Sequence, residues 1–163
     1  MGVPSKEETK RKRGKTKMSG VALNEAITVE FNLKGQPIGA ESIGLSSFLG
    51  PLVREIVPVT FSDWRKVAPE IKEVLWKSIQ VRYKLDRSWK KDYVFKTMGA
   101  LWRASKSRLV KDIKEAKNDE ERMKLKPDNI KSITEWKAFV REKTSIVFRV
   151  HRLFLIYDLK QLN

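Results

Sequence analysis

A helical repeat of apolar residues in the middle of the chain most constrains the fold. When residues 91–116 are placed on a helix, seven side chains fall within an arc of roughly 120°. They are Val94, Met98, Leu101, Trp102, Ser105, Leu109 and Ile113. A stripe this broad must pack against other elements, so the pattern predicts a long helix with one face in a helical core.

The other side of this expected helix is basic and poor in bulky side chains. Cations there alternate with Gly99, Ala100 and Ser107, and no acid occurs between Lys96 and Lys111. Small residues allow a partner to come close, and neighbouring cations can reach phosphates. We therefore predict a DNA-binding surface, with a solvated basic face as the alternative. The predicted contact residues are Lys96, Arg103, Lys106, Ser107, Lys111 and Lys114.

The overall charge favours the same class of partner. The 163 residues carry a net charge of +15, and residues 61–126 alone hold nineteen cations against ten acids. Such a balance points to nucleic acid or to an anionic membrane surface. We expect no membrane partner, because the most apolar run, 146–157, is too short to span a bilayer and contains Arg149, His151 and Arg152. The absence of cysteine excludes disulfides and thiolate metal sites.

The N-terminal residues 1–24 form a basic tail with almost no large apolar side chains. They cannot offset the entropy of ordering, so we predict a disordered segment. A dense basic cluster in such a tail is typical of a nuclear import signal, the alternatives being an arm along the DNA backbone or a nonspecific tail. We predict a nuclear location, with the signal formed by Lys10, Arg11, Lys12, Arg13, Lys15 and Lys17.

The next segment alternates between apolar and polar residues. Ile27, Val29, Phe31 and Leu33 alternate with polar side chains, which predicts a half-buried strand ended by a Lys34–Gly35 turn. A single strand needs a pairing partner. The candidates are 56–60, where Pro58 would confine pairing to an edge, the C-terminal run, or another chain.

Five further segments complete the expected fold. Residues 44–56 have helical spacing, and Gly50–Pro51 predicts a kink or a break into two short pieces. A short helix capped by Thr60 or Ser62 should reach Val67, and a longer one should cover 69–84. Residues 117–129 are charged and predict a loop or a frayed extension. Ser132 and Glu135 form a capping box before an apolar face of Ile133, Trp136 and Val140.

We therefore predict a mainly α fold. It is a small helical bundle with a short N-terminal β-strand or hairpin and a disordered basic N-terminal tail. Residues 25–142 form the helical DNA-binding domain, and residues 143–163 form an atypical apolar C-terminal segment. Trp64, Trp76 and Trp102 should be buried together in the core.

Five sequence blocks in order resemble a known family. The blocks are VEFNLKGQPIG, SSFLGPLVREIVPVTFSDWRKV, LWKSIQVRYKLD, GALWRASKSRL and EWKAFV. Over residues 15–145 the chain resembles the plant transposase family of the Ptta/En/Spm type, found in CACTA-type DNA transposons, and more loosely a Myb/SANT-like or trihelix-like domain. The resemblance implies a nuclear, transposon-derived protein whose helical part binds DNA. The matching positions are Trp64, Arg65, Trp76, Trp102, Arg103 and Lys106.

The last twenty residues, TSIVFRVHRLFLIYDLKQLN, depart from the family pattern, which predicts a truncated or degenerate copy. Asp158 follows an apolar run, as the first acid of a two-metal transposase site does, but no βαβ pattern supplies further acids. Asp63, Glu70 and Glu73 stand at expected helix starts, and His151 is the only histidine. We therefore predict no catalytic site, no metal, no cofactor and no small-molecule ligand.

Two functions follow from these features. The first is a DNA-binding, non-catalytic module of a transposon-derived protein, which uses the basic face of the helix 91–116. The alternative is a protein-assembly module that uses the strand 27–33 and the apolar C-terminal segment, with incidental basic charge. In addition to DNA, other transposon-encoded subunits or a second copy of the chain are candidate partners.

Overall fold

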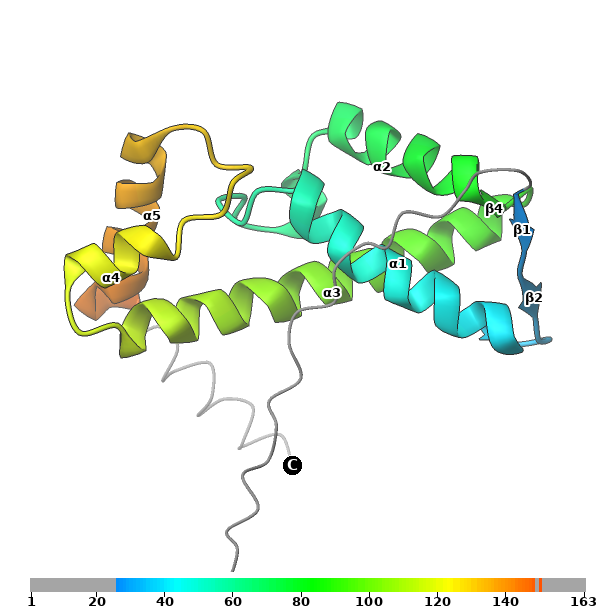
Figure 1. Ribbon diagram of the computed structural model, residues 1–163, viewed down its shortest axis with the longest axis horizontal. Coiled ribbons are helices and arrows are strands. Elements are labelled where there is room, and N and C mark those ends of the chain that lie inside the picture. The colour runs from blue at the N-terminus through cyan, green and yellow to red at the C-terminus, as the bar shows by residue number, and fades with distance from the viewer. Residues whose placement is uncertain (1–25, 149, 151–163) are drawn as a thin grey trace, which may run out of the picture.

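The structure is a computed structural model that describes residues 26–148 and 150 (Figure 1). This part of the chain is mainly helical, which confirms the expected fold class. The tail 1–24 and nearly all of the apolar run after Phe148 lie outside the described residues. The helices are α1 (Ala40–Ile56), the short 3₁₀ helix η1 (Trp64–Lys66), α2 (Pro69–Arg82), α3 (Ser88–Glu115), α4 (Asp119–Lys124) and α5 (Ile133–Thr144). The strands are β1 (Ile27–Thr28), β2 (Glu30–Phe31), β3 (Pro37–Ile38) and β4 (Tyr83–Lys84).

Helix α3, with 28 residues, runs from the region of α1 and α2 to that of α4 and α5 (Figure 1). It connects two apolar clusters. Its first half packs with α1 and α2 around a cluster that includes Trp76 and Trp102. Its second half packs with α5 around a smaller cluster that includes Ile113, Trp136 and Phe139. The buried face of the long helix thus packs against different elements along its two halves.

The predicted strand is present but shorter, and its partners differ from those expected. Val29 is buried between β1 and β2, whereas Leu33 is fully exposed, so the predicted burial of Leu33 is wrong. The chain turns at once because the Asn32 side chain accepts the backbone N–H groups of Lys34 and Gln36. Gly35, at φ 71°, supplies the left-handed conformation of this turn.

Both strand partners lie within the chain. β1 pairs in parallel with β4, and β2 pairs antiparallel with β3. The segment 56–60 is therefore not the partner of either strand. It is the end of α1 and a loop that contains Pro58.

Helix α1 runs through Pro51 as one element, so the predicted break into two pieces does not occur. Leu49 and Gly50 before the proline, and Leu52 and Val53 after it, are all buried against the core. Burial on both sides of the proline stabilises the helical path and offsets the hydrogen bond that the missing N–H cannot make.

Two short helices are capped by residues other than those predicted from the sequence. Asp63 caps η1 in place of Thr60 or Ser62. The segment predicted as a loop or frayed extension contains α4, whose cap Asn118 accepts the Glu121 N–H at 2.9 Å. Asn118 followed three residues later by Glu121 is the spacing of a capping box, so the sequence did carry this signal.

Helix α5 begins as predicted, with the Ser132 hydroxyl accepting the Glu135 N–H at 3.2 Å. Trp136 is fully buried, and its Nε1 donates to the Arg122 carbonyl oxygen at 3.2 Å. Ile133 is 49 % exposed, so its predicted place on the apolar face is wrong, and Phe139 is buried instead. The anchored indole fixes the rotation of α5 about its axis.

Candidate nucleic-acid interface

The buried face of α3 is turned relative to the predicted stripe. Leu101, Ser105 and Leu109 are only half-buried, whereas Gly99 and Val110 are buried. A Cβ atom on Gly99 would lie 2.9 Å from Cδ1 of Trp64. Gly99 is therefore small because the Trp64 ring packs on it, and its predicted place on the basic surface is wrong.

The three core tryptophans are arranged almost as predicted. Trp102 is 1 % exposed and Trp76 is buried in the same cluster. Trp64 packs against this cluster but remains half-buried, with its ring centroid 6.0 Å from that of Trp102. Trp64 thus belongs both to the core and to the surface next to α3.

The predicted contact residues fall into an open group and an enclosed group. Lys96, Arg103, Ser107 and Lys111 are exposed on α3. Lys111 lies 3.7 Å from the Glu115 carboxylate, and Lys114 is half-buried with its Nζ 4.8 Å from the Phe148 ring centroid. None of the ion pairs among the described residues includes Arg103. Arg103 is therefore well placed to meet a phosphate.

Lys106 is the enclosed member of the set. Its Nζ donates to the backbone carbonyl of Phe61 and lies 4.9 Å from the Trp102 ring centroid. It also lies 5.8 Å from the centroid of the Phe139 ring, and Nζ of Lys143 lies 5.2 Å from the same centroid. Burial lowers the pKa of Lys106 to about 8, and the nearby Lys143 ammonium lowers it in the same direction.

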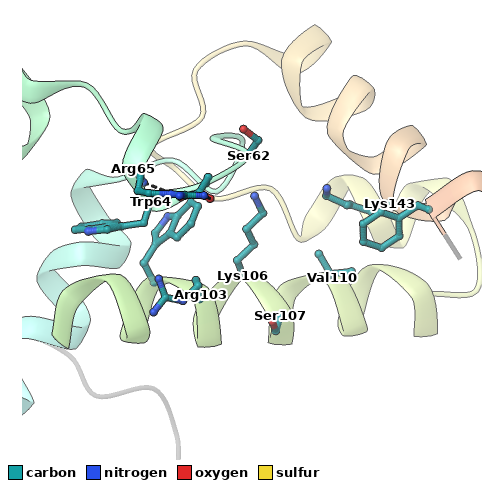
Figure 2. A pocket seen from close by; sticks show the side chains of 11 residues that line it. Ser62, Trp64, Arg65, Arg103, Lys106, Ser107, Val110 and Lys143 are labelled. Carbon is teal, nitrogen blue, oxygen red and sulfur yellow. Dashed lines mark hydrogen bonds and ion pairs between the residues drawn. The ribbon is translucent and has the colours of Figure 1, made fainter. Parts of the chain in front are cut away.

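A pocket of about 660 Å³ brings these side chains together (Figure 2). Figure 2 shows Lys106 extending from α3 toward the segment that carries Ser62 and Arg65, while Lys143 points in from α5. The pocket is lined by cations, by aromatic rings and by a single acid among the described residues. The cations are Arg65, Arg103, Lys106 and Lys143, and the rings are Trp64, Trp102 and Phe148.

The acid of the pocket, Asp63, is already paired. Its carboxylate accepts the Arg65 backbone N–H and the Arg65 Nη2, each at 2.8 Å. These hydrogen bonds, the side-chain one above all, hold the pKa of Asp63 well below its usual range, and the charge of Arg103 contributes in the same direction. Asp63 therefore stays ionised and engaged with Arg65, and the pocket as a whole remains positive.

Only part of this pocket was predicted from the sequence. Arg103, Lys106 and Ser107 were predicted as contacts, and Arg65 and Trp64 as positions that match the family. Lys143 and Phe148 were missed because they come from α5 and the residues after it. Nothing in their local sequence indicates that α5 folds back on α3.

Within 26–148 and 150, no group of three His, Cys, Asp or Glu residues could hold a metal ion. Asp158 and His151, considered above as catalytic or metal-binding residues, lie outside the described residues. No helix in the described part of the chain is long and apolar enough to cross a membrane.

Comparison with known proteins gives no relative. No protein-family model, no curated protein and no solved structure matches this chain.

Proposed function

We propose that this chain is a DNA-binding, non-catalytic module of a transposon-derived, transposase-like protein that acts in the nucleus. The observation that carries the proposal is Arg103, exposed on α3 without an ion pair among the described residues, beside a pocket with three further cations. Cations held in a fixed array neutralise phosphates and release condensed counterions, which supplies affinity for DNA.

The burial of α3 supports DNA over a membrane surface as the partner. A helix that lies in a membrane interface must turn its large apolar side chains toward the lipid. In α3, however, Trp102, Met98 and Ile113 are buried in the two clusters of the protein. What α3 leaves exposed near the pocket is charged or small, as a phosphate-binding face requires.

The second candidate is assembly with another subunit or a second copy of the chain. Assembly through the predicted strand 27–33 is not needed to complete its pairing, because β1 and β2 already pair within the chain. Assembly through the C-terminal segment has one supporting observation, which is that Ile146, Val147 and Val150 are exposed. Self-association that does not change with salt, measured by sedimentation of the full chain, would favour this candidate.

Replacing Arg103 by alanine should weaken DNA binding by roughly 1–3 kcal/mol. The slope of log affinity against log salt should fall by about one unit, because one phosphate contact is lost. Fluorescence anisotropy with labelled duplexes over a salt series measures both quantities. A loss that is uniform across DNA sequences would show that Arg103 contacts the backbone, whereas a relaxed base preference would show base contact.

The matched control is Lys77→Ala. Lys77 is exposed on α2, with its Nζ 3.8 Å from the Glu73 carboxylate, and it lies outside the pocket. This variant should bind DNA almost as the wild type does. Equal losses from the two variants would mean that attraction is diffuse over the protein, and the assignment of a dedicated face on α3 would be wrong.

The N-terminal residues 1–20 should carry a cytoplasmic reporter into the nucleus when fused to it. The basic cluster is dense enough for recognition as an import signal. Replacement of Lys10, Arg11, Lys12 and Arg13 by alanine should return the reporter to the cytoplasm, as fluorescence microscopy can show. A reporter that stays cytoplasmic with the intact segment would remove this support for a nuclear role.

A further inference from the structure

The pocket beside α3 brings like charges together in a partly dry environment. Lys143 is 7 % exposed, and Lys106 is half-buried in contact with the same Phe139 ring. Lys143 has Glu142 as a partner at 2.5 Å, whereas Lys106 makes no ion pair within the described residues and contacts the Phe61 carbonyl and aromatic faces. Two ammonium groups so placed repel each other, and an anion between them would remove that repulsion.

The size of the pocket argues for more than a phosphate group. At about 660 Å³ it lies within the range of roughly 300–1,000 Å³ typical of small-molecule sites. Aromatic side chains form part of its wall, Trp64 and Phe148 among them. Lys143 and Lys114 approach the Phe148 ring, at 4.6 and 4.8 Å from its centroid, whereas Lys72 lies farther from the Trp64 ring, at 5.6 Å from its centroid. Trp64 is therefore the ring we assign to stacking.

We propose that this pocket takes one unpaired nucleotide of the bound DNA. Its phosphate would lie among Arg103, Lys106 and Lys143, and its base would stack on Trp64. The inference rests on the proposed function, since it concerns the same face of α3. A base within a duplex is covered by its neighbours, whereas an unpaired base offers a π-face to aromatic side chains.

The test compares three labelled duplexes with the full chain at one salt concentration. The first is blunt, the second carries one unpaired nucleotide at its 3′ end, and the third carries an abasic sugar phosphate there. We expect the second to bind roughly tenfold more tightly than the first, the ratio that stacking of one base supplies. The abasic duplex should recover only a small part of this gain.

Two variants test whether the tighter binding of the overhang duplex comes from the pocket. Arg103→Gln should reduce the ratio between overhang and blunt duplex, because it removes a cation from the pocket. Lys77→Gln, exposed on α2 and outside the pocket, should leave that ratio unchanged. Free deoxyadenosine monophosphate should compete only weakly with the overhang duplex, because it lacks the neighbouring phosphates.

Three results would overturn the inference. Equal affinity for blunt and overhang duplexes would leave the proposed function intact but show that no unpaired nucleotide is held. Equal affinity for the abasic and the complete overhang would show that the base is not taken. Binding of the free monophosphate as tight as that of the overhang duplex would make the pocket a site for free nucleotides. Absence of binding to all three duplexes would instead contradict the proposed function itself.

Discussion

Replacing Trp102 by alanine should lower the free energy of unfolding by roughly 3–5 kcal/mol, the usual cost of truncating a large core side chain. Trp102 is 1 % exposed and lies where α3 meets the main apolar cluster and η1. Its Nε1 has no hydrogen-bond partner among the described residues. The expected loss therefore comes from packing and from the cavity that remains, and not from a broken hydrogen bond.

Urea denaturation of the full chain, followed by circular dichroism, measures this loss as a shift of the midpoint at constant slope. Trp89→Ala is the matched control. Trp89 lies on the same helix but is 43 % exposed, with one edge-to-face contact to Phe31 at 5.1 Å. Trp89→Ala should lower the free energy of unfolding by much less than Trp102→Ala does. Similar losses for the two variants would show that the core is not centred on Trp102.

The long helices could be predicted from sequence because their signals are strong and local. In α2, Pro69 stands at the first turn and Leu75, Trp76 and Ile79 repeat at helical spacing. Leu75, Trp76 and Ile79 are buried as expected. Where a local rule and tertiary packing disagreed, as at Pro51 in α1, packing prevailed and the helix continued.

The rotation of α3 could not be predicted from α3 alone. A wheel treats the helix as having one partner, but its two halves pack against different elements. Val110 is buried by the α5 side and Gly99 by Trp64, so the buried face turns toward both. Lys106 lies on that turned face, which is why it is enclosed rather than open to solvent.

The strand pairing and the pocket could not be predicted from the sequence, for the same reason. β1 pairs with β4, and the pocket joins the segment 62–65, α3, Lys143 and Phe148. Each unites segments that are far apart in the chain. Local periodicity predicts an element and the face it offers, but it contains no information about which distant element meets that face.

DNA affinity of the wild-type chain should fall about tenfold between pH 7 and pH 9 at constant salt. Before binding, Lys106 has a pKa of about 8 because burial and the charge of Lys143 disfavour its ammonium form. A phosphate in the pocket would favour the charged form and raise that pKa. Binding above pH 8 must then be accompanied by proton uptake, and each pH unit above the free pKa costs about a factor of ten.

The charged groups that face Lys106 are Lys143 and Glu142 from α5, and Asp63 before η1. Lys143 lowers the pKa of Lys106, whereas the two carboxylates raise it, and burial is the largest cause of the net lowering. Asp63 stays ionised throughout this range, because its hydrogen bonds to Arg65 hold its pKa below the usual value. Lys106→Arg is the matched variant, since a guanidinium remains charged up to pH 12 and above. Its DNA affinity should be nearly constant from pH 7 to 9. An equal fall in this variant would assign the pH dependence to another group.

The fall of DNA affinity with pH can be distinguished from unfolding of the protein. The contribution of Lys106 to the stability of the free protein changes with pH in the opposite direction. The pKa of Lys106 is about 8 in the folded chain, against an ordinary value of 10.5. Between these values the unfolded state binds more protons than the folded state, so the contribution of Lys106 to stability rises with pH. DNA affinity should therefore fall over a range in which this contribution grows, and loss of folded protein would not explain the fall. Urea midpoints at pH 7 and pH 9, compared between the wild type and Lys106→Arg, measure that contribution.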